Sequence, residues 1–107
     1  MMTLAAAFVC IMSFAAAQRD TVRILAIGNS FSEDAVEQHL YDLANEEGVP
    51  VIIGNMYIGG CSLEKHLNNA RNNEPAYKYR KIGLDGNKVE TVSFTLESAL
   101  ADEKWTM

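Results

Sequence analysis

The stretch "ILAIGNSFSEDAVEQHL" (residues 24–40) decides the fold that this sequence predicts. It continues an apolar run, "VRILAIG" (22–28), which is typical of a strand buried on both faces of a parallel sheet. An acidic, amphipathic stretch follows and predicts a helix over residues 33–47, with Ser32 as its N-cap and Gly48 just beyond its end. The start of the chain therefore predicts a strand, a tight turn and a helix.

The apolar residues of this helix recur at helical spacing. Val36, Leu40, Leu43 and Ala44 fall on one face, which we expect to pack on the sheet. The acidic residues Glu37, Asp42 and Glu46 are expected to lie elsewhere on the helix.

A second strand and helix follow the first pair. "VPVIIGNMYIGG" (49–60) is another apolar run that ends in two glycines, and Ser62 opens a more polar helix over residues 63–72. Two strands separated by a helix make a βαβ unit, whose crossover is expected to be right-handed.

The pattern changes in the last third of the chain. "AYKYRKIG" and "KVETVSF" flank "LDGN" and predict a β-hairpin that turns at Asp85-Gly86. A helix capped by Thr95 is then expected over residues 95–105, and it should cover one face of the sheet through Leu96, Ala99 and Leu100.

The first residues have the pattern of a secretory signal peptide. Residues 4–17 are apolar or small and end in three alanines before Gln18. We therefore expect a leader over residues 1–17, a mature domain over residues 18–107, and export to the periplasm or beyond. After cleavage no stable membrane span is expected; a buried N-terminal helix or a membrane anchor is the alternative.

The charge and the cysteine content argue against a nucleic-acid-binding protein and against a disulfide-bonded domain. The formal net charge is −5 and the lysines and arginines are scattered, which argues against a nucleic-acid partner. Cys61 is alone once the leader with Cys10 is removed, so no internal disulfide is expected.

Ser30 stands where an α/β sheet commonly holds its ligand, in the turn at the carboxyl end of a strand. Gly28 allows a tight turn, and a helix N-terminus presents free N–H groups that suit an oxyanion. Ser30 could then attack an ester carbonyl, with its own N–H as an oxyanion donor. An ordinary turn is the alternative, because glycine, asparagine and serine all favour turns.

The second strand ends in "IGGCSLEKH" (58–66), at the same edge of the predicted sheet. The N–H of Gly60 could therefore approach an oxygen held above Ser30. A glycine pair that only lets the chain turn is the alternative.

"ILAIGNSFSED" together with "NMYIGGCSLEKHL" resembles the first two sequence blocks of the SGNH (GDSL-like) hydrolases. The resemblance is to a bacterial exported subgroup with Gly-Asn-Ser-Phe-Ser in its first block. It implies a flavodoxin-like αβα sandwich, of which this chain is the amino-terminal part with a β-hairpin insertion. It also implies that Ser30 is the nucleophile, that the N–H groups of Ser30 and Gly60 are oxyanion donors, and that Gly28 and Asn29 support the turn. Asn29 stands where the commoner family pattern has aspartate.

The family's later blocks, an asparagine oxyanion donor and an Asp-x-x-His pair, are missing before Met107. A serine without a base is weakly nucleophilic. His39 and His66 are expected to point away from the turn, so neither is assigned as a base. Cys61 is a rival nucleophile at a helix N-terminus, although a small packing residue is the simpler interpretation. We expect no cofactor, and no metal, because Cys61 and His66 lack a third ligand.

Two functions remain open at this stage. The first is the amino-terminal part of an exported serine esterase or carbohydrate deacetylase, acting on a small-molecule or glycan ester and inactive alone. The second is a non-catalytic module that binds a carbohydrate or acyl group. A fragment without a function of its own is a third interpretation, and its exposed sheet edge would favour self-association.

Overall fold

The structure, a computed structural model, describes residues 20–107. It contains four strands and five helical segments, four of which lie between strands. In chain order these are β1 (Val22–Gly28), α2 (Ser30–Ser32), η1 (Glu33–Leu40), α3 (Tyr41–Glu46), β2 (Val51–Tyr57), α4 (Leu63–Asn72), β3 (Tyr77–Ile82), β4 (Lys88–Phe94) and α5 (Leu96–Asp102). The expected leader, residues 1–17, lies outside the described residues.

The four strands form one mixed sheet in the order β1-β2-β3-β4. The pair β1 and β2 is parallel, with Ile24 opposite Ile53 and Gly28 opposite Tyr57. The other two pairs are antiparallel. The two parallel strands and the hairpin that the sequence predicts are thus confirmed.

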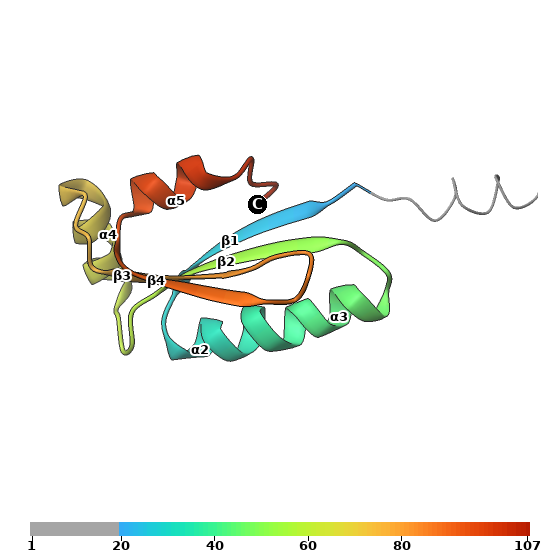
Figure 1. Ribbon diagram of the computed structural model, residues 1–107. Coiled ribbons are helices and arrows are strands. Elements are labelled where there is room, and N and C mark those ends of the chain that lie inside the picture. Colours follow the sequence, from blue (N-terminus) through green and yellow to red (C-terminus); the bar gives the residue numbers. More distant parts are fainter. Residues whose placement is uncertain (1–19) are drawn as a thin grey trace, which may run out of the picture.

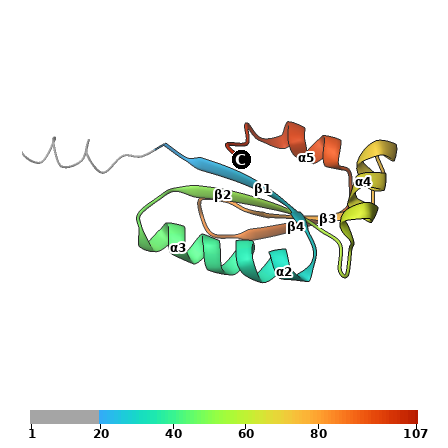
Figure 2. The same ribbon diagram turned by 180° about the vertical axis from the view of Figure 1, so that it is seen from behind.

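Helices lie on both faces of this sheet (Figure 1 and Figure 2). The continuous helical segment α2–η1–α3 runs along one face, and α5 lies on the other. The helix α4 lies at the end of the sheet where β1 and β2 finish. The chain therefore has a mixed α/β fold. Within residues 20–107, no helix combines the length and the apolar character needed to cross a membrane.

The main core lies between the sheet and α5. Met56, Tyr77, Tyr79 and Ala99 are buried together there, and Trp105 packs against them. A Cβ on Gly54 would lie 2.8 Å from the Trp105 ring and 2.9 Å from the Tyr79 ring, so only glycine leaves room for both rings. This glycine in the middle of a buried strand serves close packing rather than a turn.

The helix α5 is shorter than the sequence predicts, and one of its contacts is different. It begins as expected, with the Thr95 hydroxyl oxygen accepting from the N–H of Ser98, but it ends at Asp102. Leu100 is 60% exposed, so the expectation that it covers the sheet is wrong. Ala99, fully buried, and Leu96 pack against the core as expected. The indole of Trp105 also packs there, and its Nε1 donates to the Ala99 carbonyl.

The opposite face of the sheet contains a buried ionic cluster. Glu37, which the sequence places away from the sheet, has a side chain only 1% exposed. Its carboxylate accepts hydrogen bonds from Asn55 Nδ2 at 2.6 Å and from Arg80 Nε at 3.0 Å, and it lies 2.6 Å from Lys88 Nζ. Glu37 lies three residues before Leu40 and seven before Ala44, so helical spacing itself puts it at the border of the apolar face, and the expectation that it lies elsewhere is wrong. Three donors on the sheet compensate the buried charge.

The end of α5 is attached to the sheet by a second group of charges. Asp102 accepts from the Tyr79 hydroxyl at 2.7 Å and from Lys81 Nζ at 2.8 Å. The hydrogen bond from Lys81 is the main cause that lowers the pKa of Asp102 below its ordinary 3.8. Burial, with the hydrogen bond to Asp102, raises the pKa of Tyr79.

We predict that Glu37→Gln lowers the free energy of unfolding by about 3 kcal/mol, because it leaves buried donors and the Arg80 charge without their carboxylate. Urea denaturation measures this. Glu90→Gln is the matched control, since Glu90 also pairs with Arg80 but its side chain is 42% exposed; its cost should stay below about 1 kcal/mol. Equal losses in the two variants would contradict a special role for the buried carboxylate.

We also predict an acid-side loss of stability at Asp102. Its folded pKa is lowered, so its contribution is present above the ordinary value of 3.8 and is lost as the pH falls through the folded pKa. Asp102→Asn should flatten this part of the curve of unfolding free energy against pH, and should cost less than about 1 kcal/mol at pH 7 because the pair is partly solvated. Asp42→Asn, at an exposed site in α3, serves as control. An unchanged acid limb in the Asp102 variant would refute the assignment.

Candidate functional site

The loops after β1 and β2 are hydrogen-bonded to each other at one end of the sheet. The N–H of Ile58 donates to the Gly28 carbonyl at 3.2 Å. Asn29 Nδ2 donates to the Cys61 carbonyl, also at 3.2 Å. The two loops that carry the expected site residues are therefore neighbours, as the parallel pairing of their strands requires.

Ser30 is the first residue of α2 and is exposed. The residue before it, Asn29, is the N-cap: its backbone is extended and its Oδ1 accepts from the N–H of Phe31 at 3.1 Å. The prediction that Ser32 caps this helix is wrong, because the helix begins three residues earlier, at Ser30. The Ser32 hydroxyl instead contacts the Asn29 carbonyl at 2.7 Å and Asn55 Oδ1 at 3.2 Å. Asn29 thus caps the helix with one side-chain atom and binds the second loop with the other.

Two glycines shape these loops, each for its own reason. A Cβ on Gly28 would lie 2.5 Å from Ser32 Oγ, so the turn into α2 closes only over a glycine. Gly60 is exposed and has a φ of +65°, a left-handed conformation that favours glycine. The close contact that Gly28 permits is therefore with the side chain of Ser32 and not with a ligand.

The N–H groups of Ser30 and Gly60 are open donors. Within residues 20–107, neither N–H has a hydrogen-bond acceptor. Both belong to exposed residues of the two connected loops. Such groups can bind a carbonyl oxygen or an oxyanion that reaches the loops from solvent.

His66 lies closer to this region than the sequence suggests. Its Nδ1 is 2.9 Å from the Tyr77 hydroxyl, and its ring stacks on the Tyr77 ring. Burial lowers the pKa of His66, and an interaction with the Gly28 carbonyl partly offsets this. Its Nε2 is buried and makes no hydrogen bond of good geometry among the described residues, so the Gly28 carbonyl acts on it only by proximity. Sequence reasoning missed this placement because the partner, Tyr77, belongs to a strand that is distant in sequence.

No described histidine, however, is hydrogen-bonded to Ser30. His39 is exposed on η1. Within residues 20–107, the structure therefore contains a serine at the loops without a base bound to it.

Cys61 is 5% exposed, and its thiol donates to the Ser62 carbonyl at 3.5 Å. This burial favours the packing interpretation over a nucleophilic thiol. Among residues 20–107 there is no group of three histidine, cysteine or acidic side chains that could hold a metal ion.

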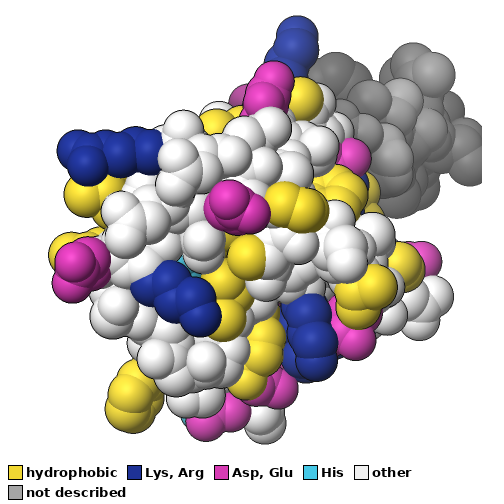
Figure 3. Space-filling model, turned by 90° about the vertical axis from the view of Figure 1, so that its left-hand side faces the viewer, with side chains coloured by type: hydrophobic (Ala, Val, Ile, Leu, Met, Phe, Trp, Pro, Cys, Tyr) yellow, Lys and Arg dark blue, Asp and Glu magenta, His cyan; other side chains and the backbone are white. Residues whose placement is uncertain are grey.

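An apolar hollow lies beside the loops, between the end of β1, α4 and the start of α5. It is lined by Ile27, Leu63, His66, Leu67, Ala70 and Leu96. Figure 3 looks onto this end of the molecule, where apolar side chains lie between charged ones. Leu63 is 86% exposed and Ile27 is 47% exposed. The hollow offers apolar contacts within the reach of a ligand bound at the loops.

Sequence reasoning also missed a series of hydrogen-bonded polar side chains behind the loops, formed by Ser32, Asn55 and Glu37. Ser32 contacts Asn55, and Asn55 donates to Glu37. The sequence carries one signal for it: Asn55 is a lone amide within the apolar run "VIIGNMY", where a buried side chain must find polar partners.

Comparisons with known proteins identify a family. The model of the DUF4886 family, described as a domain of unknown function, matches residues 23–107. The chain belongs to this family. A crystal structure of a DUF4886 family protein from Bacteroides uniformis ATCC 8492 is 66% identical, with a TM-score of 0.76 over 80% of this chain. The match covers 33% of that protein, so the chain spans about a third of its length. No curated protein matches the chain.

The assignment to the SGNH hydrolases is therefore wrong. The family that matches is DUF4886, and the solved structure that matches belongs to the same family. The sheet is also a mixed one of four strands, with only one parallel pair. The two sequence blocks that carry the resemblance form a strand, a glycine turn and a capped helix, and many α/β domains need these same residues for the same local geometry.

We predict that Asn29→Ala lowers the free energy of unfolding by about 2 kcal/mol, because it removes both the helix cap and the bond to the Cys61 carbonyl. Asn29→Ser keeps a capping oxygen but cannot reach Cys61, so it should cost about half as much. Asn68→Ala, at an exposed site in α4, should change stability by less than about 0.5 kcal/mol. Urea denaturation of the three variants tests this, and a serine variant as stable as the parent would exclude the bond between the loops as a stabilising contact.

Proposed function

We propose that this member of the DUF4886 family supplies the nucleophile and oxyanion donors of a serine ester hydrolase. In this proposal Ser30 Oγ attacks an acyl carbonyl, and the N–H groups of Ser30 and Gly60 bind the oxygen that becomes negative. The alcohol leaves, and water then releases the acyl group from Ser30 as a carboxylic acid. The observation that carries the proposal is the pair of open N–H groups on two loops that Asn29 holds together.

The electrostatics of the turn support this role. Ser30 stands at the N-terminus of a helical segment that runs through residue 46, where the helix dipole favours negative charge. The Asn29 side chain, bound to both loops, limits how far the two N–H groups can separate. Preorganised donors of this kind supply a large part of catalysis in acyl transfer.

The proton of Ser30 needs an acceptor that residues 20–107 do not place beside it. We propose that this base comes from a region that corresponds to the part of the solved relative outside the match, since the chain spans a third of that protein. The same completion would extend the mixed sheet to a flavodoxin-like αβα sandwich. The substrates we propose are esters of small molecules or glycans. The signal-peptide-like sequence pattern of residues 4–17 supports action outside the cytoplasm.

A non-catalytic acyl-binding or carbohydrate-binding role is the second candidate. The open apolar hollow at Ile27, Leu63 and Leu67 favours an acyl ligand. In that case the loops would bind the ester carbonyl, and Ser30 would serve only as a contact.

We predict that the purified chain hydrolyses p-nitrophenyl acetate negligibly, and that activity appears when residues 23–107 replace the matching third of the Bacteroides uniformis protein. In this chimera Ser30→Ala should lower kcat at least about 1000-fold. Ser62→Ala, at an exposed serine in the other loop, is the control and should change kcat less than about threefold.

The outcomes of this experiment distinguish a catalytic role of Ser30 from a binding role. A chimera whose turnover survives Ser30→Ala refutes the nucleophile. A folded chimera that binds acyl esters without hydrolysing them favours the binding role. Turnover by the purified chain that depends on Ser30 would show that no further base is needed.

A further inference from the structure

The outer edge of β1 already pairs with the last two residues of the chain. The N–H of Leu25 donates to the Met107 carbonyl at 2.8 Å, and the N–H of Met107 donates to the Arg23 carbonyl at 3.2 Å. This is the hydrogen-bond pattern of two parallel strands, with Met107 beside Ile24. The Thr106 hydroxyl also accepts from the N–H of Arg23.

Beyond the N–H of Leu25, the outer edge of β1 has no backbone partner among residues 20–107. In a parallel pair, alternate residues present both backbone groups to the same side. Val22 and Gly28 bond toward β2 and its flanking loops, whereas Arg23 and Leu25 bond outward. By this alternation the Leu25 carbonyl and both backbone groups of Ile27 face outward, and within residues 20–107 nothing pairs with them.

The two edges of the sheet differ in composition. The opposite edge, β4, carries Lys88 and Glu90, and a register irregularity near Ser93, which has a φ of 54°. Charges and bulges of this kind prevent strands from adding to an edge. By contrast β1 reads "VRILAIG", the sequence of an interior strand, with a single charge.

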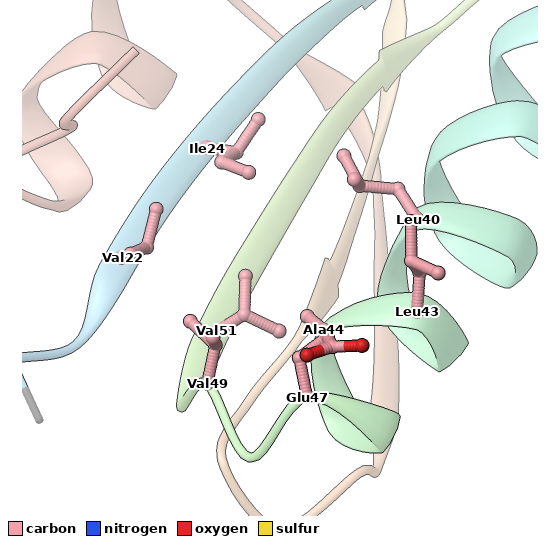
Figure 4. A pocket seen from close by; sticks show the side chains of 8 residues that line it. All are labelled: Val22, Ile24, Leu40, Leu43, Ala44, Glu47, Val49 and Val51. Carbon is pink, nitrogen blue, oxygen red and sulfur yellow. The ribbon is translucent and has the colours of Figure 1, made fainter.

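The strand β1 is also less buried than its apolar sequence would lead one to expect. The residues Val51–Met56 of β2 are all buried, whereas β1 is half-buried along its length and Ile27 is exposed. On the helical face, Val22 and Ile24 border an apolar hollow that faces Leu40 and Leu43 (Figure 4). The helix covers β2 more closely than it covers β1, as the burial of the two strands shows.

We propose that the free edge of β1 is a docking site for an extended strand that runs parallel to β1 and continues the pairing begun by Thr106 and Met107 as far as Ile27. The occupant is an apolar segment that corresponds to the part of the solved DUF4886 family protein that this chain does not span. The half-formed parallel pairing sets its direction, and the 33% coverage of the solved relative provides the polypeptide. The strand binds through main-chain hydrogen bonds, in the manner of β-augmentation.

The test uses this chain together with the remainder of the Bacteroides uniformis protein, expressed as a separate polypeptide. We expect the two to associate, and we expect the amide of Ile27 to exchange at least about tenfold more slowly in the complex, as measured by NMR hydrogen exchange. Ile27→Pro removes the outward N–H and should weaken association at least about tenfold, while an edge strand tolerates the proline in the isolated chain. Val92→Pro, at the irregular part of the other edge, should leave association unchanged.

The proposal is wrong if the two polypeptides do not associate, or if the Ile27→Pro chain associates as strongly as the parent chain. It is also wrong if the Ile27 amide exchanges as fast in the complex as in the isolated chain. Protection of Ile27 by self-association alone would make a second copy the occupant and would also refute it. None of these readouts involves Ser30 or ester hydrolysis, so the docking edge and the proposed function can fail separately.

Discussion

The buried carboxylate of Glu37 holds the helical layer to the sheet, and much of the candidate site depends on it. It accepts from Asn55 in β2 and Arg80 in β3, and it pairs with Lys88 in β4. One side chain thus links η1 to three strands. A buried carboxylate is costly without such partners, so helix and sheet must meet in one arrangement for all the bonds to form.

This cluster continues to the Ser30 turn through a short polar chain. Asn55 contacts the Ser32 hydroxyl, which in turn contacts the Asn29 carbonyl. Asn29 then caps the helix and binds the loop after β2. The geometry of the two loops therefore depends on the polar contacts behind them, and the exposed Ser30 follows a residue, Asn29, that hydrogen bonds hold in place.

Two other features, the outer edge of β1 beyond the N–H of Leu25 and the serine side chain in the turn after it, lack hydrogen-bond partners among residues 20–107. The strand β1 has the sequence of an interior strand but the burial of an edge. Ser30 lies at two loops with open N–H groups, but within residues 20–107 no histidine is hydrogen-bonded to it. The two observations concern β1 and the turn that follows it, and both proposals look to the part of the solved family protein that this chain does not span.

Local structure was largely predictable from the sequence alone. The strand runs, the caps at Ser62 and Thr95, and the hairpin at Asp85-Gly86 follow from short-range patterns, because capping and turn formation involve residues a few positions apart. The nearness of the Ser30 and Gly60 loops followed from parallel pairing. The family did not follow, because strand–turn–helix motifs are shared among unrelated α/β domains.

Only the tertiary structure decided the contacts between distant segments. It paired Glu37 with side chains of three strands, brought His66 beside Tyr77 and Gly28, and left Leu100 in solvent. Helical spacing could not foresee these results, since the partners come from strands far along the chain. What the sequence determined by itself was which segments become strands and helices and where they turn. Which side chains face one another was decided by packing and by the need to pair every buried charge.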